Sequence, residues 1–351
     1  MAYADSCTES PEAGTGTVDR APTLSHVAAL AGVSPATASR VLSGSARVSR
    51  AARDQVEAAV RQLGYVPRRS ALRAAPPGTA VAVVLCEDSE RVFADPFFAR
   101  LLHGVERELD GRAPLAVLMA GRDARALGDG CAAQYLRGGH AAGAVVVGAR
   151  RDHPTVLARI GPPVVLAGRP LCGPPLPFVD ADNLGGARLA VRHLLASGRT
   201  AVATIAGPPD MSAGADRLAG YRSALAEAGL SADGLVARGD FGRLSGEHAM
   251  NRLLARRPGL DAVLAASDAM AVGALGALRR AGRRVPDDVA VVGFDDGPFA
   301  QRAVPRLTTV RQPVEEMGAR LVRELLDRLG GRRGRDRGVV LRTRLVRRDS
   351  A

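Results

Sequence analysis

A short segment of small and polar residues around Arg40 has the chemistry to recognise the edge of a base pair. The Arg40 guanidinium can donate two parallel hydrogen bonds, a geometry that matches O6 and N7 of guanine. Pro35 and Ala36 offer apolar contact, for example with a thymine methyl group, and Ser34 and Ser39 add hydroxyls. We therefore predict that Arg40 is the leading base-reading residue on an outward-facing helix surface.

A second set of residues has the chemistry to hold a small polar molecule. Arg217 provides a fixed fork of donors, Asp295 an acceptor, and Phe97 and Phe98 flat aromatic faces. The alternatives are that Asp295 caps a loop and that the two phenylalanines belong to ordinary core. Since the chain has seven Phe and no Trp, two adjacent phenylalanines still favour a ligand site.

No residue pattern typical of an enzyme or a metal site occurs along the chain. The G-x-S-x-G elbow, the P-loop and the H-E-x-x-H helix are all absent. The six histidines show no ligand spacing, and the four cysteines, Cys7, Cys86, Cys131 and Cys172, lie far apart. We expect no catalytic activity, no cofactor and no metal, and such cysteine usage suits a reducing cytoplasm.

Three short helices are needed to position the segment around Arg40, and apolar residues at helical spacing predict them between residues 23 and 65. Gly32 lies in a tight turn between the first two helices. Ser34 and Pro35 open the second as its N-cap and first helical residue, and Ser49 caps the third. The inner face of the second helix is expected to hold Val33, Thr37, Ala38 and Val41.

The rest of the chain, after a Pro- and Gly-containing linker at 70–79, alternates short apolar runs with amphipathic helices. The runs are 80–85, 142–147, 164–166, 201–205, 262–265 and 289–294, and the helices include 97–109, 184–196, 217–228, 269–281 and 314–329. This alternation predicts parallel sheets covered on both faces, with enough strands for two sheets. Loops at the strand ends would face one another across a ligand-binding cleft.

The composition indicates a globular protein with a basic N-terminal part. The 351 residues suggest two or three domains, and no apolar run approaches the roughly 20 residues of a membrane span, so we expect a cytoplasmic protein without a membrane partner. The net charge is +12, and residues 21–75 carry half of this excess, with eight arginines and two carboxylates. Residues 1–22 are polar and are expected to form a disordered leader.

The run from Thr23 to Leu42 closely resembles the headpiece of the lactose/galactose repressor (LacI/GalR) family. The resemblance continues through Arg-Asp-Gln-Val at 53–56 to Leu-Gly-Tyr-Val-Pro at 63–67, the family's third helix and its exit. It implies a helix-turn-helix whose second helix enters the major groove. Arg47, Arg50, Arg68 and Arg69 are candidates for phosphate contacts. The full implied DNA-binding set is Ser34, Pro35, Ala36, Thr37, Ser39, Arg40, Arg47, Arg50, Tyr65, Arg68, Arg69, Leu72 and Ala74.

The segment that follows departs from the family's pattern. In the family it forms a hinge helix that wedges a leucine into the minor groove. Here Ala74 stands where that leucine would fall, and Leu72, two residues earlier, takes the place of a usual arginine. Either the hinge is shortened and Leu72 is the wedge, or the protein bends its DNA less.

The resemblance extends over about 81–348 to a type I periplasmic-binding-protein fold. It is carried by Asp-Pro-Phe-Phe at 95–98, Arg-Leu-Ala-Gly-Tyr at 217–221, Ser-Asp-Ala-Met-Ala at 267–271, and Val-Pro-Asp-Asp-Val at 285–289 with Gly-Phe-Asp-Asp at 293–296. In the family, Asp95 is usually Asn and Ser267 is often an amide, so the ligand stays open, with a sugar as the default expectation. The implied effector-binding set is Asp95, Phe97, Phe98, Arg169, Arg217, Ser267, Asp268, Asp295 and Gln312.

The expected architecture is an all-α helix-turn-helix headpiece followed by an α/β domain of two lobes, each with a parallel sheet. We expect a leader at 1–22, the headpiece at 23–67, a hinge or linker at 68–79 and the effector-binding and dimerisation domain at 80–348. Within that domain, lobe 1 takes about 80–181 and 312–339, and lobe 2 about 182–311 and 340–348.

The family resemblance implies a transcriptional regulator, expected to be a repressor, that binds a palindromic operator as a homodimer and is controlled by a small polar effector. The arginine-rich stretch 332–337 lacks the heptad pattern of a tetramerisation helix, which favours a dimer. Whether the effector induces or corepresses is left open. A small-molecule receptor without DNA function is the remaining alternative, and it would leave 23–67 unexplained.

Overall fold

The computed structural model describes residues 24–42, 48–63, 80–331 and 338–351, and the chain divides into two units, residues 1–74 and 75–351. The expected leader at 1–22 and the expected hinge or linker at 68–79 lie outside the described residues. No helix in the described ranges is long and apolar enough to cross a membrane.

Residues 24–42 and 48–63 form three helices, α1 (Leu24–Leu30), α2 (Pro35–Leu42) and α3 (Arg50–Leu63). Gly32, with φ +64°, makes the turn between α1 and α2, a conformation that glycine adopts without strain. Ser34 Oγ accepts a hydrogen bond from the Thr37 backbone N–H at 3.1 Å, and Ser49 Oγ caps α3 in the same way. Both predicted caps are confirmed. The small core consists of Val27, Ala28, Ala31, Ala38, Val41, Val56 and Ala59.

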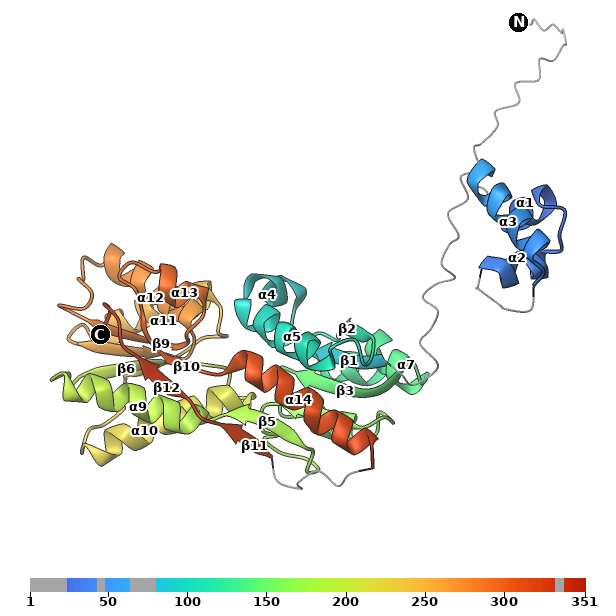
Figure 1. Ribbon diagram of the computed structural model, residues 1–351. Helices are drawn as coiled ribbons and strands as arrows, with labels where there is room; N and C mark the ends of the chain where they lie inside the picture. The colour runs from blue at the N-terminus through green and yellow to red at the C-terminus, as the bar shows by residue number, and fades with distance from the viewer. Residues whose placement is uncertain (1–23, 43–47, 64–79, 332–337) are drawn as a thin grey trace, which may run out of the picture. The chain divides into compact units, whose positions relative to one another are not determined.

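The second unit is built on two six-stranded sheets (Figure 1). The first sheet has the order β11-β5-β4-β3-β1-β2 and is parallel throughout. Its strands are β1 (Ala80–Leu85), β2 (Leu115–Met119), β3 (Ala141–Val147), β4 (Val164–Ala167), β5 (Phe178–Ala181) and β11 (Val339–Leu341).

The second sheet has the order β12-β10-β9-β8-β6-β7, with β12 antiparallel to β10 and the other pairs parallel. Its strands are β6 (Val202–Ala206), β7 (Val236–Arg238), β8 (Ala262–Ala265), β9 (Ala290–Asp295), β10 (Thr308–Arg311) and β12 (Arg344–Val346).

Helices cover both faces of each sheet, which is why the central strands are almost wholly apolar. All six residues of β1 are buried; Val81, Val83 and Leu85 pack into one core and Ala82 and Val84 into another. The helices with the first sheet are α4 (Ser89–Ala94), α5 (Pro96–Leu109), α6 (Ala124–Asp129), α7 (Cys131–Arg137), α8 (His153–Leu157) and α14 (Val314–Leu329). Those with the second are α9 (Asn183–Ala196), α10 (Ser212–Glu227), α11 (Arg243–Arg256), α12 (Asp268–Arg280) and α13 (Pro298–Arg302).

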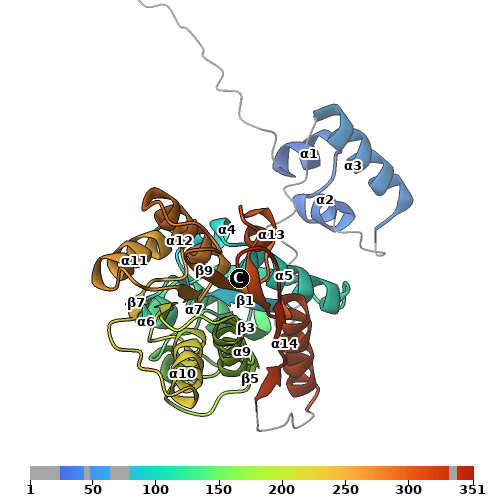
Figure 2. The ribbon, with the colours of Figure 1, turned by 90° about the vertical axis from the view of Figure 1, so that its left-hand side faces the viewer.

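The chain passes between the two sheets three times: from β5 to β6, from β10 to α14, and from β11 to β12. After the second passage α14 packs against α5, as both ribbon views show (Figures 1 and 2). The two helices can approach closely because Gly104 of α5 lies against the backbone of α14. A Cβ at Gly104 would lie 2.0 Å from the Glu315 carbonyl oxygen. The three passages hold the carboxyl ends of the parallel strands around one cleft.

Candidate functional site

The exposed surface of α2 carries most of the DNA-binding residues predicted within the described chain. Ser34, Pro35, Ala36, Ser39 and Arg40 are exposed, whereas Ala38 and Val41 turn into the core. The half-buried Thr37 places its hydroxyl 2.8 Å from that of Ser34, so the two are joined at the start of the helix. Arg50, also exposed, is the first residue of α3. The small outward side chains let the α2 backbone approach a flat or grooved partner closely.

The other predicted DNA contacts, Arg47, Tyr65, Arg68, Arg69, Leu72 and Ala74, lie outside the described residues. The two alternatives for the hinge therefore stay predictions.

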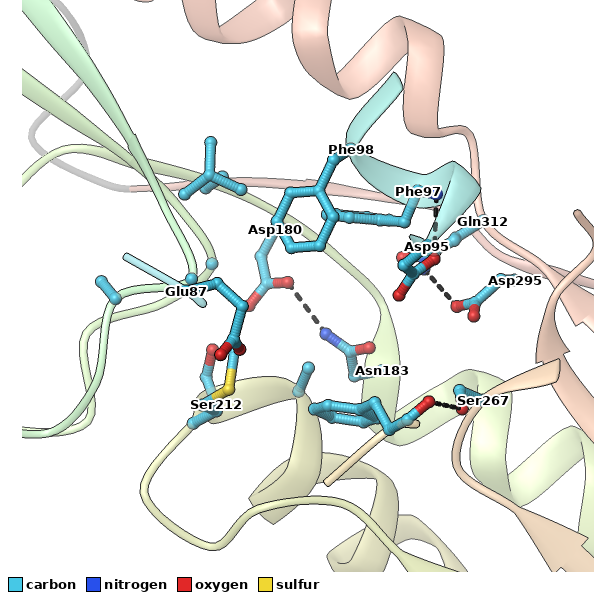
Figure 3. Close-up of a pocket in the computed structure, with 18 of the residues that line it drawn as sticks. Glu87, Asp95, Phe97, Phe98, Asp180, Asn183, Ser212, Ser267, Asp295 and Gln312 are labelled. Atoms are coloured by element: carbon cyan, nitrogen blue, oxygen red, sulfur yellow. Dashed lines mark hydrogen bonds between the residues drawn. The ribbon is translucent and has the colours of Figure 1, made fainter. Parts of the chain in front are cut away.

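In the second unit, a cavity enclosing about 740 Å³, part of it open to solvent, lies where strands of both sheets end. Seven of the nine residues predicted to bind an effector line this cleft cavity, and all of them except Arg217 are labelled in Figure 3. They are Asp95, Phe97, Phe98, Arg217, Ser267, Asp295 and Gln312.

Two predicted residues, Arg169 and Asp268, do not line the cavity. The Arg169 guanidinium reaches Asp216 at 2.7 Å, and only its backbone N–H serves the site, by donating to Asp180. Asp268 is buried and its carboxylate is occupied: it accepts from the Gly297 N–H at 3.0 Å and from Thr309 Oγ1 at 2.6 Å. Both side chains support neighbours of the cavity without facing it.

Arg217, which lies on α10, is 6% exposed and is held on several sides. Its Nε donates to Asn183 Oδ1 at 2.8 Å and its Nη1 to the Ala266 carbonyl oxygen at 2.5 Å. The guanidinium carbon also lies 3.6 Å from the centre of the Phe294 ring, a cation–π contact. Burial lowers the pKa of Arg217, an effect that the charge of Asp295 opposes. A guanidinium fixed in this way is already oriented before a ligand arrives.

Burial raises the pKa of three carboxylates that line the cavity, Asp95, Asp180 and Asp295. Asp295 ends β9 with φ +119°, and its Oδ1 accepts from Gln312 Nε2 at 2.6 Å. Burial raises the pKa of Asp295 to about 7, although the nearby Arg217 opposes the shift. Asp180 accepts from Asn183 Nδ2 at 2.8 Å, and burial raises its pKa to about 6. The net charge of the cavity therefore changes with pH in the range around neutrality.

Aromatic faces lie beside these polar groups. Phe97 and Phe98 meet edge to face with ring centres 5.5 Å apart, and Phe98 packs into the core while also lining the cavity. Phe241, which the sequence did not indicate, lies under the guanidinium groups of Arg91 and Arg217, at 5.2 and 5.6 Å. Alternating polar groups and flat rings suit a ligand with hydroxyls at its edge and apolar C–H faces.

Several further lining residues were not predicted, although the sequence carried a signal for some. Glu87 follows β1, at the carboxyl end where site residues collect, and Asn183 follows β5. Glu87 is 1% exposed, pairs with Arg91 at 2.6 Å and also contacts Arg122 and Arg150. The position of Glu87, a charged residue directly after a buried strand, is the signal in the sequence that could have identified it as a site residue.

Comparison with known proteins gives two matches to protein families. Residues 23–68 match bacterial regulatory proteins of the lacI family, and residues 191–351 match the periplasmic binding protein-like domain. These two matches cover the predicted headpiece and much of the two-lobed part, and they confirm the predicted fold class.

Curated relatives and solved structures agree. The chain is 46% identical over 340 residues to the HTH-type transcriptional regulator CelR of Thermobifida fusca, covering 94% of this chain and 98% of that protein. It is 36% identical over 299 residues to the HTH-type transcriptional regulator GalR of Escherichia coli (strain K12), covering 84% and 85%.

Among solved structures, the complex of the transcriptional regulator CelR with cellobiose matches with a TM-score of 0.75 and 44% identity, covering 94% of this chain and 100% of that one. The lac repressor dimer bound to operator and the anti-inducer ONPF matches with a TM-score of 0.72 and 28% identity, covering 94% and 99%. These relatives are regulators rather than enzymes, as the sequence predicted. The chain belongs to the lacI family of bacterial regulatory proteins and is a helix-turn-helix transcriptional regulator.

Proposed function

We propose that this protein is a repressor that binds a two-fold symmetric operator as a homodimer, and that a small carbohydrate in the cleft cavity controls its affinity for that operator. The observation that carries the proposal is the pairing of two sites: an exposed α2 surface with small residues around Arg40, and a cavity where Arg217, Asn183 and Gln312 lie beside aromatic rings. The expected boundaries, with the headpiece at 23–67 and the effector domain at 80–348, are part of the proposal.

On the DNA side, Arg40 reads a guanine edge and the other exposed residues of α2 allow close approach to the major groove. Arg50 contacts a phosphate, a contact that adds affinity but little sequence preference. The predicted contacts outside the described residues complete the set.

On the effector side, the ligand is a disaccharide of the cellobiose type. CelR, solved in complex with cellobiose, is the relative that supports this choice. Phe97 and Phe241 supply surfaces for the apolar faces of the sugar rings, and Arg217 and Asp295 supply hydrogen bonds for hydroxyls.

The DNA claim is tested by selecting sites from random duplexes with purified protein at about 0.15 M salt, where weak phosphate binding is partly screened. A two-fold symmetric consensus is expected, and Arg40→Ala should lose preference at one position of each half-site. Arg222→Ala, which changes an exposed arginine of α10, should leave the consensus intact. If the wild-type protein enriches no sequence, the operator claim fails.

The ligand claim is tested by calorimetry with cellobiose and, as a matched control, with galactose. Saturable binding of one cellobiose per chain is expected, with galactose at least tenfold weaker because it fills only part of the cavity. Equal affinity for the two sugars, or no heat with cellobiose, contradicts a disaccharide effector.

A further inference from the structure

Two carboxylates from different lobes line the same part of the cleft cavity. Asp95 precedes α5 beside the first sheet, and Asp295 ends β9 in the second sheet. Figure 3 shows both side chains at the Gln312 end of the cavity. Neither is sealed off: their side chains are 17% and 16% exposed. A bound molecule could therefore contact both carboxylates at once.

Both carboxylates can accept further hydrogen bonds, whereas most donors around them already donate to other groups of the protein. Asp95 Oδ1 accepts from the Phe97 N–H at 3.0 Å, and Asp295 Oδ1 accepts from Gln312 Nε2 at 2.6 Å. A carboxylate can accept about four hydrogen bonds. Arg217 Nε and Nη1 are directed to Asn183 and Ala266 instead. This part of the cavity suits a ligand that donates hydrogen bonds.

The positive charges nearby do not fully neutralise the two carboxylates. Burial raises the pKa of Asp95, and the negative charge of Asp95 is among the causes that raise the pKa of Asp295. Arg91 Nη2 lies 3.8 Å from Asp95 and Arg217 Nη1 lies 3.7 Å from Asp295. Arg91, Arg217 and Glu87 act on the charge of Asp95, and Arg217 and Asp95 act on that of Asp295. Asp295 in turn acts on Arg100 and Asp268.

We propose that Asp95 and Asp295 act as one unit that retains a proton in the absence of a ligand and releases it when the effector donates hydroxyl hydrogens to both carboxylates. The proton passes to solvent, through the exposed edge of the pair. This inference rests on the proposed carbohydrate effector. It makes Asp95 a specificity-determining residue, because its charge selects ligands with two donors at this position.

The sign of the pH dependence follows from linkage. The unliganded protein binds a proton that the liganded protein does not, so acidification stabilises the unliganded protein relative to the complex. Affinity for a neutral, hydroxyl-bearing ligand therefore falls as pH drops through the range around 7, by up to about tenfold per pH unit for one proton.

The first test needs no ligand. Infrared spectra of the empty full-length protein across pH 4–9 report the stretch of protonated carboxyl groups, compared with Asp95→Asn. Asn retains an oxygen that can accept from the Phe97 N–H, so α5 keeps its cap. A protonated carboxyl band with a midpoint near 7 is expected in the wild type, shifted down by at least one pH unit in Asp95→Asn. Asp123→Asn, a change at the N-cap of α6, should leave that midpoint in place.

If no carboxyl titrates near pH 7, or if Asp95→Asn leaves that midpoint unchanged, the pair is overturned whatever the effector is.

The second test is cellobiose calorimetry between pH 5.5 and 8.5 in two buffers of different ionisation enthalpy. Proton release on binding is expected, with affinity that falls below pH 7 in the wild type. In Asp95→Asn the fall should move to lower pH by as much as the infrared midpoint does. If the infrared titration finds the pair but the cellobiose affinity of the wild type does not change with pH, the proposed coupling between the proton and the ligand is wrong. If cellobiose binds at no pH, the effector named above is wrong, while the infrared titration still decides the pair.

Discussion

Arg217 is the residue that most directly joins the architecture to the proposed ligand site. Its hydrogen bonds to Asn183 and Ala266 connect the starts of α9 and α12, and its stacking on Phe294 fixes the plane of the guanidinium. Lysine carries the same charge but lacks the planar fork and the stacking surface. Charge alone therefore does not explain why an arginine stands here.

Arg217→Lys should weaken cellobiose binding at least tenfold and lower the free energy of unfolding by about 1.5–3 kcal/mol, because a buried acceptor on Asn183 or Ala266 loses its donor. Calorimetry and chemical denaturation measure the two effects. Arg222→Lys, at an exposed position of the same helix, is the control and should change neither. Unaltered binding by Arg217→Lys would argue against a directional role for the guanidinium.

At this scale, most of the cavity-lining side chains could be predicted from the sequence, because chemically distinctive residues follow the ends of strands or stand at the starts of helices. It included Arg169 and Asp268, which face neighbouring side chains instead. Which side of a loop a side chain faces depends on tertiary contacts that a local pattern does not contain. Phe241 was missed for the same reason: it adopts φ +72° in a loop after a three-residue strand.

At the scale of elements, six strands and most of the long helices were predicted closely, and the other strands were not. The predicted runs at 80–85 and 262–265 coincide with β1 and β8, and the helix at 314–329 with α14. The three-residue strands β7 and β11 are too short to show a period of two. The helix predicted from 217 begins at Ser212, because its first turn is small and polar rather than apolar.

The contact between α5 and α14 depends on glycine. Gly104→Ala would place a Cβ 2.0 Å from the Glu315 carbonyl oxygen, so the helices must move apart, and we expect a loss of about 1–3 kcal/mol in the free energy of unfolding. Gly276→Ala in α12 is the matched control: its nearest neighbours lie 3.6 Å away or more, so it should stabilise by roughly 0.4–1 kcal/mol. Equal effects of the two substitutions in urea denaturation would show that the close approach is not needed.

At the scale of the whole effector domain, ion pairs link segments that belong to the two sheets. Arg150, after β3, meets Asp210, after β6, at 2.6 Å, and Arg169, after β4, meets Asp216 of α10 at 2.7 Å. Ala149, Gly168 and Met211, the chain neighbours of Arg150, Arg169 and Asp210, line the cavity, so both pairs lie beside it. They stabilise this arrangement of the two lobes, by the modest amounts typical of partly exposed pairs.

Asp210→Asn should therefore weaken cellobiose binding about two- to fivefold at low salt, and the difference from the wild type should shrink at about 0.5 M salt. Asp349→Asn removes a pair with Arg306 at 2.8 Å that lies within the second lobe, and it should leave cellobiose affinity unchanged. Calorimetric titrations at both salt concentrations compare the variants. A salt-independent loss, or the same loss in Asp349→Asn, would remove lobe closure as the explanation.

The central claim, that one chain couples operator binding to a carbohydrate in the cleft cavity, is tested most directly by fluorescence anisotropy with the selected operator, with and without saturating cellobiose. Linkage requires that cellobiose changes operator affinity by the same factor by which operator changes cellobiose affinity, and we expect a factor of about 5 to 150. The direction of the change identifies an inducer or a corepressor. Identical operator affinity with and without bound cellobiose would contradict the account.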